Sequence, residues 1–535
     1  MRGWAPLAVV VATWPLAAAD LVRWGREANK VTLRLSIGAA EMEWISASTF
    51  RLIQCRSVPC AGRTRSAEAV DFTIDDHGPN LEITTKYLTV RIRKTGVLLE
   101  IHSRTGKLLL RDTGEGEREA QDSERFFGLG ARAAESLDLR GAIVESGGGP
   151  LISSQGYGLY YSTPPRPVFD LCRTAPARVR VRAEPPGPIE YYFYYGPSPK
   201  EILEEHLEVT GTIAAPKPGH LELLAAGDLP PYAIPVQASS ADGWERLAEI
   251  LRRLAHGSLS GALVPAFDLA AWDDAPAAVR ARASQPAAIL PIVYRSRLGA
   301  TPDSWFAERR KWTPYLMTYL QEARDRGLPV IHPLPLQYPA DAEAARYADE
   351  FLVGDEILVA PIYSASDRRS VYLPMGQWTR LDTNLRYTGR RVVEITAPPE
   401  RLPMFAKNGT IVPIAGAAAD APMELHYFPM LAAEFFLYEP DRGSSTQFHA
   451  APAGDFMRLE IESKQTRLYE WVVHHLDPVA AVEIAGRPSE AAGETGQLAP
   501  GRWHYDRASR NLRIRIEAAA DSDIIINITF KESEP

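Results

Sequence analysis

The sequence predicts a multidomain protein built from β-sandwiches and one α/β section. Its length of 535 residues exceeds what a single hydrophobic core usually supports. Apolar residues recur with a period of two toward both ends of the chain and with the helical period in its middle. Hydrophobic residues make up 45% of the chain and charged residues 24%, which is typical of a globular protein.

The first twenty residues have the pattern of a secretory signal peptide. A basic residue precedes an apolar run, and the small residues Ala17 and Ala19 end it. We therefore expect residues 1–19 to be cleaved and the protein to be secreted or periplasmic. The alternative is a buried N-terminal helix, which Pro6 and Pro15 would interrupt. No other stretch is long enough to span a membrane.

Residues 30–211 predict an antiparallel β-sandwich with a helix at its end. Polar and apolar residues alternate from 80 to 112, and Thr95-Gly96 and Thr105-Gly106 have the composition of hairpin turns. The run Y-Y-F-Y-Y at 191–195 would place alternate rings on opposite faces of a strand, which favours core packing over a sugar-stacking platform.

A domain boundary is expected near residue 211. Ser198 is placed as the N-cap of a helix, with Pro199 in its first turn, and Gly211 ends the apolar spacing. From 212 to 345, helical and strand-like runs alternate, which favours βα units and a parallel sheet. The helical runs are 244–255 and 304–326, and the strand-like runs are 261–267 and 287–294.

Short strands return after residue 345. They predict a proximal C-terminal β-sandwich over 346–418 and a distal C-terminal β domain over 419–535.

Composition also bounds the partners of the protein. The chain has 59 Lys and Arg against 67 Asp and Glu, a net charge of -8 without a basic stripe, so no nucleic-acid partner is expected. The eleven histidines lack ligand spacing, so no metal is expected. No phosphate loop is recognisable, so no other cofactor is expected either. Cys55 and Cys60 form either a small disulfide or two free thiols, and Cys172 stands alone.

Several ordered motifs resemble glycoside hydrolase family 31, the α-glucosidase family. They lie at 125–132, 150–161, 191–211, 327–341, 354–362, 371–378 and 402–413. The resemblance implies an α-glucoside as substrate or ligand and a (β/α)8 barrel. It also implies a retaining mechanism, in which a carboxylate attacks the sugar and a second carboxyl group, about 5 to 5.5 Å away, protonates the leaving oxygen.

The section that should form this barrel is short. Residues 212–338 number 127, whereas a full barrel takes about 200 to 250 residues. At about 30 residues per βα unit there is room for roughly four units, so we expect a truncated (β/α)8-type barrel. Such a barrel leaves sheet edges that must be covered by another segment or by self-association.

The stretch V-P-A-F-D-L-A-A-W-D-D-A at 264–275 places three aspartates and a tryptophan after a strand. Its context resembles a later barrel strand of the family, and by this match Asp268 lines the sugar pocket. The same alignment of motifs places Trp272, Arg282 and Arg297 in the substrate-binding region.

A nucleophile is harder to recognise. The family's nucleophile segment has no convincing match at any of the eleven tryptophans. The nearest string is Trp272-Asp273-Asp274, in which Asp274 would attack. The alternative is that Asp273 and Asp274 are solvated turn residues before a helix that starts near Pro276.

The general acid is not recognisable either. The resemblance places it near Ser239, and a serine cannot protonate a leaving group at neutral pH. Asp242 is a candidate if the loop shifts, and its alternative role is the N-cap of the helix that contains Trp244.

Three functions follow from these observations. The first is a family-31-like protein that acts on or binds α-glucosides with impaired catalysis. The second is an active retaining α-glycosidase with rearranged carboxylates, drawn from Asp268, Asp274 and Asp242. The third is a non-enzymatic carbohydrate-binding or scaffold protein.

Overall fold

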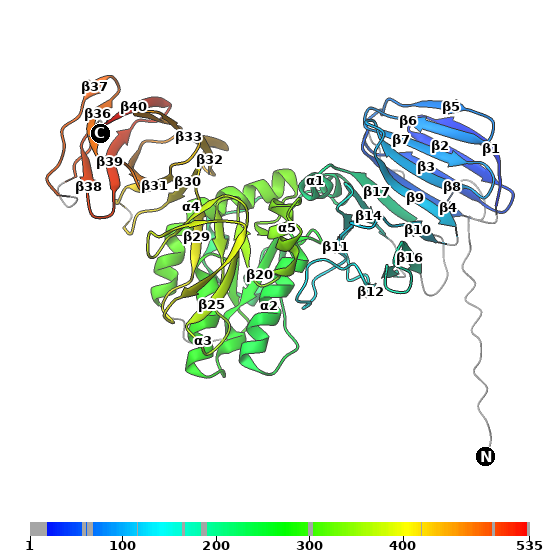
Figure 1. The fold of residues 1–535 in the computed structure, drawn as a ribbon, viewed down its shortest axis with the longest axis horizontal. Coiled ribbons are helices and arrows are strands. Elements are labelled where there is room, and N and C mark those ends of the chain that lie inside the picture. Colours follow the sequence, from blue (N-terminus) through cyan, green and yellow to red (C-terminus); the bar gives the residue numbers. More distant parts are fainter. Residues whose placement is uncertain are drawn as a thin grey trace, which may run out of the picture. The chain divides into compact units, whose positions relative to one another are not determined.

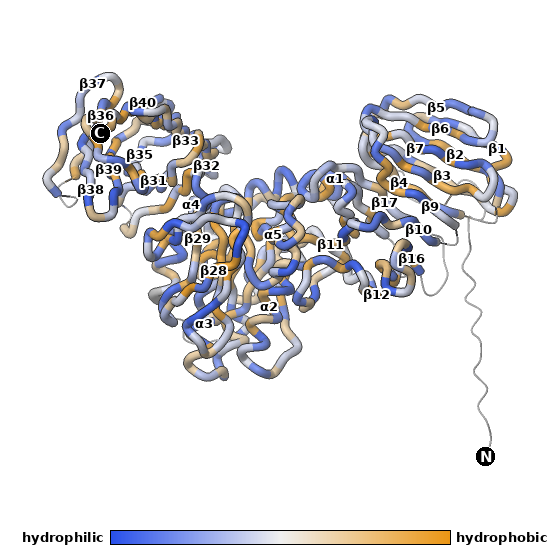
Figure 2. Tube along the Cα trace, in the orientation of Figure 1, coloured by the Kyte–Doolittle hydropathy of each residue, from blue (hydrophilic) through white to orange (hydrophobic). Residues whose placement is uncertain are grey.

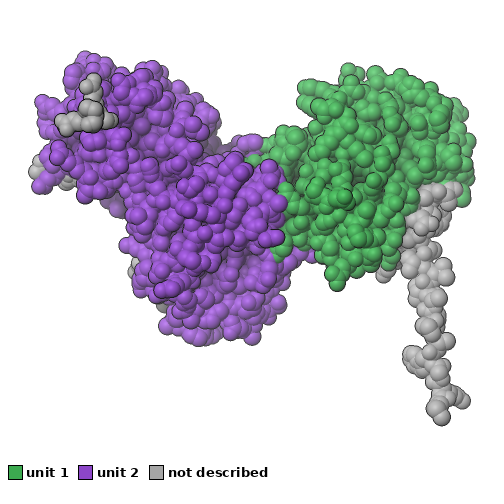
Figure 3. Space-filling view, viewed as in Figure 1, with its two compact units in different colours: residues 1–131, 136–211, 259–261 green, residues 132–135, 212–258, 262–535 purple. Residues whose placement is uncertain are grey.

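The computed structural model describes residues 19–55, 60, 68–114, 116–162, 166–182, 190–297, 303–418, 420–494 and 498–531. Apart from Ala19, the predicted signal peptide lies outside these residues. The chain forms two compact units (Figure 3). The first comprises residues 1–131, 136–211 and 259–261, and the second comprises residues 132–135, 212–258 and 262–535.

The first unit consists of two antiparallel sheets that share one hydrophobic core. The eight-stranded sheet has the order β1 (Leu21–Glu27), β2 (Lys30–Leu35), β3 (Ala39–Trp44), β4 (Thr49–Cys55), β17 (Glu190–Tyr195), β14 (Tyr157–Tyr160), β13 (Leu151–Ser153), β11 (Phe126–Gly128). The nine-stranded sheet has the order β12 (Ala142–Glu145), β15 (Val168–Leu171), β16 (Arg178–Arg182), β10 (Glu117–Glu119), β9 (Leu108–Gly114), β8 (Leu98–Ser103), β7 (Leu88–Arg93), β6 (Asn80–Thr84), β5 (Thr73–Asp76).

The alternation predicted for this unit is visible along β7 (Figure 2). Leu88, Val90 and Ile92 are fully buried, and polar residues stand between them. Gly96 and Gly106 have positive φ angles of 73° and 85° in the turns on either side of β8, as the hairpin interpretation requires.

The aromatic run at 191–195 forms most of β17, and its residues are buried except for Tyr195, which is partly buried. Phe193 is fully buried, and its ring centroid lies 5.1 Å from that of Phe50 and 5.9 Å from that of Tyr157. The prediction of core packing is confirmed. In the same unit Cys55 and Cys60 are joined by a disulfide, and Cys172 is a buried free cysteine.

Helix α1 (Pro199–Thr210) follows β17 and has the predicted start. The Ser198 side chain accepts a hydrogen bond from the Glu201 amide, and the Glu201 side chain caps the Ser198 amide in return. Gly211 follows the helix with a φ of 87°, a conformation that favours glycine.

The second unit begins with a four-stranded parallel sheet and its helices (Figure 1). The strand order is β18 (Leu223–Ala225), β21 (Ile292–Arg295), β20 (Val264–Asp268), β19 (Ala233–Pro235). The α-helices are α2 (Gly243–Ser258), α3 (Ala277–Ser284) and α4 (Asp303–Arg326), and the 3-10 helices are η2 (Pro218–Leu221), η3 (Ala226–Asp228), η4 (Leu269–Trp272) and η5 (Gln285–Ala288). Helices and parallel strands alternate as the sequence predicts.

One predicted strand is shorter than its apolar run. The run at 287–294 becomes η5 and a connecting segment before β21 begins at Ile292. Pro286 lies in the first turn of η5, and Pro291 has no N–H to donate to a sheet, so the strand starts after it.

The C-terminal part of the second unit is almost entirely β. A six-stranded sheet has the order β22 (Ile331–Pro333), β23 (Phe351–Val353), β24 (Ile357–Val359), β29 (Met404–Lys407), β26 (Gln377–Arg380), β27 (Arg386–Thr388), and β25 (Arg368–Leu373) pairs with β28 (Arg391–Thr396). Between β22 and β23 lie α5 (Leu334–Gln337) and η6 (Glu343–Arg346). None of the helices in the described ranges is long and apolar enough to cross a membrane.

Two further sheets complete the C-terminal part. The five-stranded sheet has the order β30 (Thr410–Ile414), β31 (Met423–Phe428), β35 (Arg467–Val473), β39 (Asn511–Ala518), β38 (Trp503–Asp506). The six-stranded sheet has the order β32 (Ala433–Glu439), β33 (Ser444–Ala453), β34 (Phe456–Ser463), β40 (Ser522–Phe530), β36 (Val479–Ile484), β37 (Arg487–Pro488). The boundary expected between 418 and 419 falls between β30 and β31, which are paired.

Candidate functional site

The candidate site is the carboxyl edge of the parallel sheet in the second unit. In α/β sheets and barrels, the groups that meet a ligand follow the carboxyl ends of the strands. Asp268 is the last residue of β20 and pairs with Tyr294 of the neighbouring β21. The stretch that the sequence singled out therefore does lie at this edge.

The half-buried carboxylate of Asp268 holds two backbone segments together. Its Oδ1 accepts hydrogen bonds from the Ala270 amide at 2.9 Å and from the Ser296 amide at 3.1 Å. Asp268 is thereby the N-cap of η4 and also fixes the start of the segment after β21. Burial, followed by the charge of Asp268, raises the pKa of Tyr294.

The two following aspartates are ion-paired with arginines from the segment around the end of β21. Asp273 Oδ2 lies 2.5 Å from Arg295 Nη2, and Asp274 Oδ2 lies 2.6 Å from Arg297 Nη2. Arg297 Nε is also 3.6 Å from Asp273, and its Nη2 donates to the Ala270 carbonyl at 3.1 Å. The hydrogen bond with Asp274 raises the pKa of Arg297. The carboxylate charges of both aspartates are thus taken up by guanidinium groups.

The predicted helix after these aspartates is present. Helix α3 begins at Ala277 with Pro276 in the N-cap position, as the turn interpretation of Asp273 and Asp274 predicts. Their ion pairs with Arg295 and Arg297 were not foreseen, because strand β21 and η4 are brought together only by the parallel pairing of β20 with β21.

Two of the four residues expected near the substrate are enclosed in the protein. Trp272 is 1% exposed, and its ring stacks on Phe267 with a centroid distance of 6.3 Å. Arg282 is 2% exposed and donates to the carbonyls of Ala397 and Pro398 at 2.8 and 3.0 Å.

Arg282 also pairs with Asp367 at 2.7 Å, so it connects α3 to the C-terminal β region. Burial lowers its pKa. Asp268 and Arg297 are the two expected substrate contacts that remain partly or fully exposed at the sheet edge.

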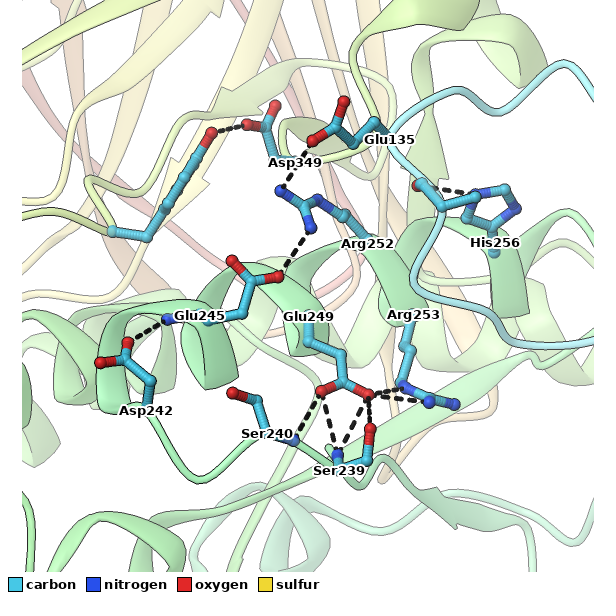
Figure 4. Close-up of polar contacts among 12 residues, drawn as sticks. Glu135, Ser239, Ser240, Asp242, Glu245, Glu249, Arg252, Arg253, His256 and Asp349 are labelled. Atoms are coloured by element: carbon cyan, nitrogen blue, oxygen red, sulfur yellow. Dashed lines mark hydrogen bonds and ion pairs between the residues drawn. The ribbon is translucent and has the colours of Figure 1, made fainter.

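The position expected for the general acid is fixed by a glutamate that the sequence did not point to (Figure 4). The Glu249 carboxylate, on α2, accepts from the Ser239 amide at 2.9 Å and from the Ser240 amide at 3.0 Å. It also accepts from the Ser239 hydroxyl at 2.9 Å and from Arg253 Nε at 2.9 Å.

These bonds make the Glu249 carboxylate the anchor of the loop before α2. Burial acts to raise its pKa, but the hydrogen bonds from Ser239, Ser240 and Arg253 outweigh it and hold the pKa of Glu249 at about 2. The side chain of Ser239 is therefore engaged with an ionised carboxylate. The only signal in the sequence was the spacing of ten residues between Ser239 and Glu249, which is not a recognised motif.

Asp242 has the capping role that was its alternative interpretation. Its Oδ1 accepts from the Glu245 amide at 2.9 Å at the start of α2 (Figure 4). Glu245 in turn pairs with Arg252 at 3.0 Å. The residues at the sheet edge and at the start of α2 are thus held in caps and ion pairs, and among the described residues no group of three or more potential metal ligands is found.

Comparison with known proteins shows similarity to one family. Residues 327–412 match the model of the glycosyl hydrolase family 31 C-terminal domain. The curated relative Alpha-glucosidase 2 of Bacillus thermoamyloliquefaciens is 33% identical over 208 residues, which are 34% of this chain and 26% of that protein. The chain therefore spans about a quarter of the length of that relative.

Solved structures extend the likeness to the whole fold. A family 31 dextranase of Flavobacterium johnsoniae, complexed with isomaltotriose, has a TM-score of 0.80 at 16% identity, covering 96% of this chain and 100% of that chain. An α-1,4-glucan lyase of Gracilariopsis lemaneiformis has a TM-score of 0.73 at 11% identity, covering 96% of this chain and 97% of that chain.

These two proteins perform different reactions on a shared fold, so the structural likeness fixes the fold and not the reaction. The family model and the curated relative add the sequence evidence. Residues 327–412 thus match the C-terminal domain of glycoside hydrolase family 31, and the chain is similar in sequence and in fold to members of that family.

Proposed function

We propose that this protein binds α-glucosides at the carboxyl edge of its parallel sheet and that its glycoside hydrolysis is impaired. The binding part is supported by the family and by names of relatives that act on α-glucosides. The proposal of impaired hydrolysis rests on the contacts that the four candidate aspartates make. Asp268 and Asp242 cap backbone amides, while Asp273 and Asp274 are paired with arginines.

Retaining hydrolysis needs a carboxylate free to attack and a second carboxyl group that holds a proton, about 5 to 5.5 Å apart. A carboxylate bound to a guanidinium is poorly suited to either role, because its lone pairs are engaged and the cation opposes its protonation. Ser239 at the expected position of the acid cannot supply the proton. The four-stranded parallel sheet is, in this proposal, the remaining part of an eight-stranded barrel.

The sheet edges of such a remnant would have to be covered, because unpaired strand edges recruit other strands. The second part of the proposal is that a second copy of this chain covers them. The measurement for this part is the oligomeric state of the purified chain by light scattering. A dimer supports self-association, and a monomer at all concentrations rejects it.

Hydrolysis is tested with an aryl α-glucoside and binding with isomaltose in the calorimeter. We expect binding without enzyme-dependent release of the aryl group. The variants Asp268→Asn and Asp274→Asn separate a true activity from a contaminant, because a contaminant is insensitive to both. Release that either substitution abolishes would reject the impaired state and support the alternative of rearranged carboxylates.

A further inference from the structure

A cavity of about 600 Å³ lies in the second unit, at a place that none of the candidate residues lines. Its volume is in the range of small-molecule sites, about 300 to 1,000 Å³. The walls come from α3 and η5, from α4, from the segments around β26 and β29, and from β30 and β31 together with His474. Because the walls come from such separate segments, the cavity forms only when this unit is folded.

One wall of the cavity is a single face of α4. Trp305, Glu308 and Trp312 are spaced by three and four residues, so their side chains lie on the same side of the helix. Trp312 is 2% exposed and belongs to the core, whereas Trp305 is only half-buried. Glu308 beside it is 39% exposed and pairs with Lys311 at 2.7 Å. A partly open indole next to a carboxylate can stack on the C–H face of a sugar ring and accept its hydroxyl hydrogens.

Another wall is held rigid by a chain of hydrogen bonds. His426 Nε2 lies 2.8 Å from Glu424 Oε2, and His426 Nδ1 lies 3.0 Å from His474 Nε2. The His474 ring stacks on Phe428 with a centroid distance of 4.4 Å. The bond from His426 is the main cause that lowers the pKa of Glu424 to about 2. A wall that is already ordered reduces the conformational entropy that the protein loses when a ligand binds.

The charged side chains around the cavity are largely paired. The acids of the lining are Glu308, Asp382, Glu400 and Glu424, and its bases are Lys311 and Arg401. Lys311 pairs with Glu308 at 2.7 Å, Arg380 with Asp382 at 2.6 Å and Arg513 with Glu424 at 3.4 Å. The lining therefore carries little net charge and offers oxygen acceptors, which suits neutral hydroxyl groups.

We propose that this cavity is a second saccharide-binding site that accepts a short neutral oligosaccharide stacked on Trp305 and hydrogen-bonded to Glu308. The proposal rests on the carbohydrate-binding part of the proposed function, but it uses residues separate from those at the edge of the parallel sheet. The two sites can therefore be removed one at a time.

The experiment titrates the full chain with isomaltotriose and with maltotriose in the calorimeter. It is combined with hydrogen exchange of the peptides that contain 303–315 and 264–275. We expect saccharide to protect the α4 peptide, and Trp305→Ala to weaken this binding about tenfold or more through loss of stacking. Glu308→Gln keeps the side-chain shape and should weaken binding less, so it supports the assignment even if Trp305→Ala perturbs the fold.

Two controls make the outcome specific. Trp24→Ala removes a half-buried tryptophan of the first unit and should leave the affinity unchanged. Asp268→Asn should abolish protection at 264–275 and preserve it in α4.

The results separate the two proposals. Saccharide binding that is unchanged in both Trp305→Ala and Glu308→Gln overturns the second site and leaves binding at the sheet edge standing. Binding lost only in the cavity variants supports the second site and rejects binding at Asp268. Absence of any saccharide protection of the α4 peptide overturns the second site.

Discussion

Replacing Glu249 by glutamine should release the loop that precedes α2. In the wild type, the Glu249 carboxylate accepts five hydrogen bonds. Two come from the Ser239 amide, one from the Ser239 hydroxyl, one from the Ser240 amide and one from Arg253 Nε. Glutamine has one acceptor oxygen, and its amide group would face these donors with hydrogens of its own. The variant keeps the size of the side chain, so packing changes little.

The magnitude follows from the pKa of Glu249. A value of about 2, against 4.5 for an ordinary glutamate, corresponds to about 3 kcal/mol of stability. The carboxylate is 5% exposed, but Arg253 is 28% exposed, so we reduce the expected loss for Glu249→Gln to about 2 kcal/mol. Because the folded pKa is depressed, this contribution is complete above about pH 4.5 and is lost as the pH falls toward about 2.

The assay is urea denaturation of the wild type and the variant between about pH 3 and pH 7, with hydrogen exchange at the amides of Ser239 and Ser240. Glu245→Gln is the matched control on the same helix. Among the described residues, the Glu245 side chain, which is 56% exposed, pairs only with Arg252. We therefore expect Glu245→Gln to lower the free energy of unfolding by less than about 0.5 kcal/mol. Equal losses for the two variants, or a loss for Glu249→Gln that persists unchanged at about pH 3, would refute the reasoning.

Two further predictions concern buried charge. Arg309 is 2% exposed and donates hydrogen bonds to the backbone carbonyls of Leu221, Ala287, Leu290 and Pro291. In urea denaturation, Arg309→Met should therefore lower the free energy of unfolding by about 3 to 5 kcal/mol. A loss no larger than that of the exposed neighbour variant Arg310→Met would contradict this. Burial, then the charge of Asp355, raises the pKa of Glu356 to about 7, so its contribution favours folding below about pH 4.5 and is lost as the pH rises through 7. Denaturation at about pH 5 and pH 8 should show this loss, about 3 kcal/mol at most, in the wild type and not in Glu356→Gln, and an identical pH dependence of the two proteins would rule it out.

Periodic patterns were sufficient to predict the elements whose cause is local. Ser198 capped a helix because serine, proline and a glutamate three residues later form a capping box, and all three lie within one turn. The alternation at 80–112 produced hairpins for the same reason. The interpretation of Tyr191 to Tyr195 as core depended only on the period of a strand.

The contacts at the candidate site could not be predicted in this way, because they join residues that are distant in the sequence. Asp274 meets Arg297 only because β20 and β21 are adjacent and parallel. Arg282 is buried by residues 397–398, more than a hundred positions later. The resemblance placed Arg282 in the substrate-binding region, whereas the structure surrounds its guanidinium with these carbonyl groups and Asp367.

The parallel pairing of β31 with β35 affects how the C-terminal region can be divided for expression. Met423 lies opposite Tyr469 in this pair, and three strands of the other sheet intervene along the chain. On its other side β31 pairs with β30, which precedes residue 419. A fragment that starts at 419 would therefore present one unpaired edge of β31 to solvent, where it can recruit a strand from another molecule. The shortest C-terminal fragment that we expect to remain monomeric begins before Thr410.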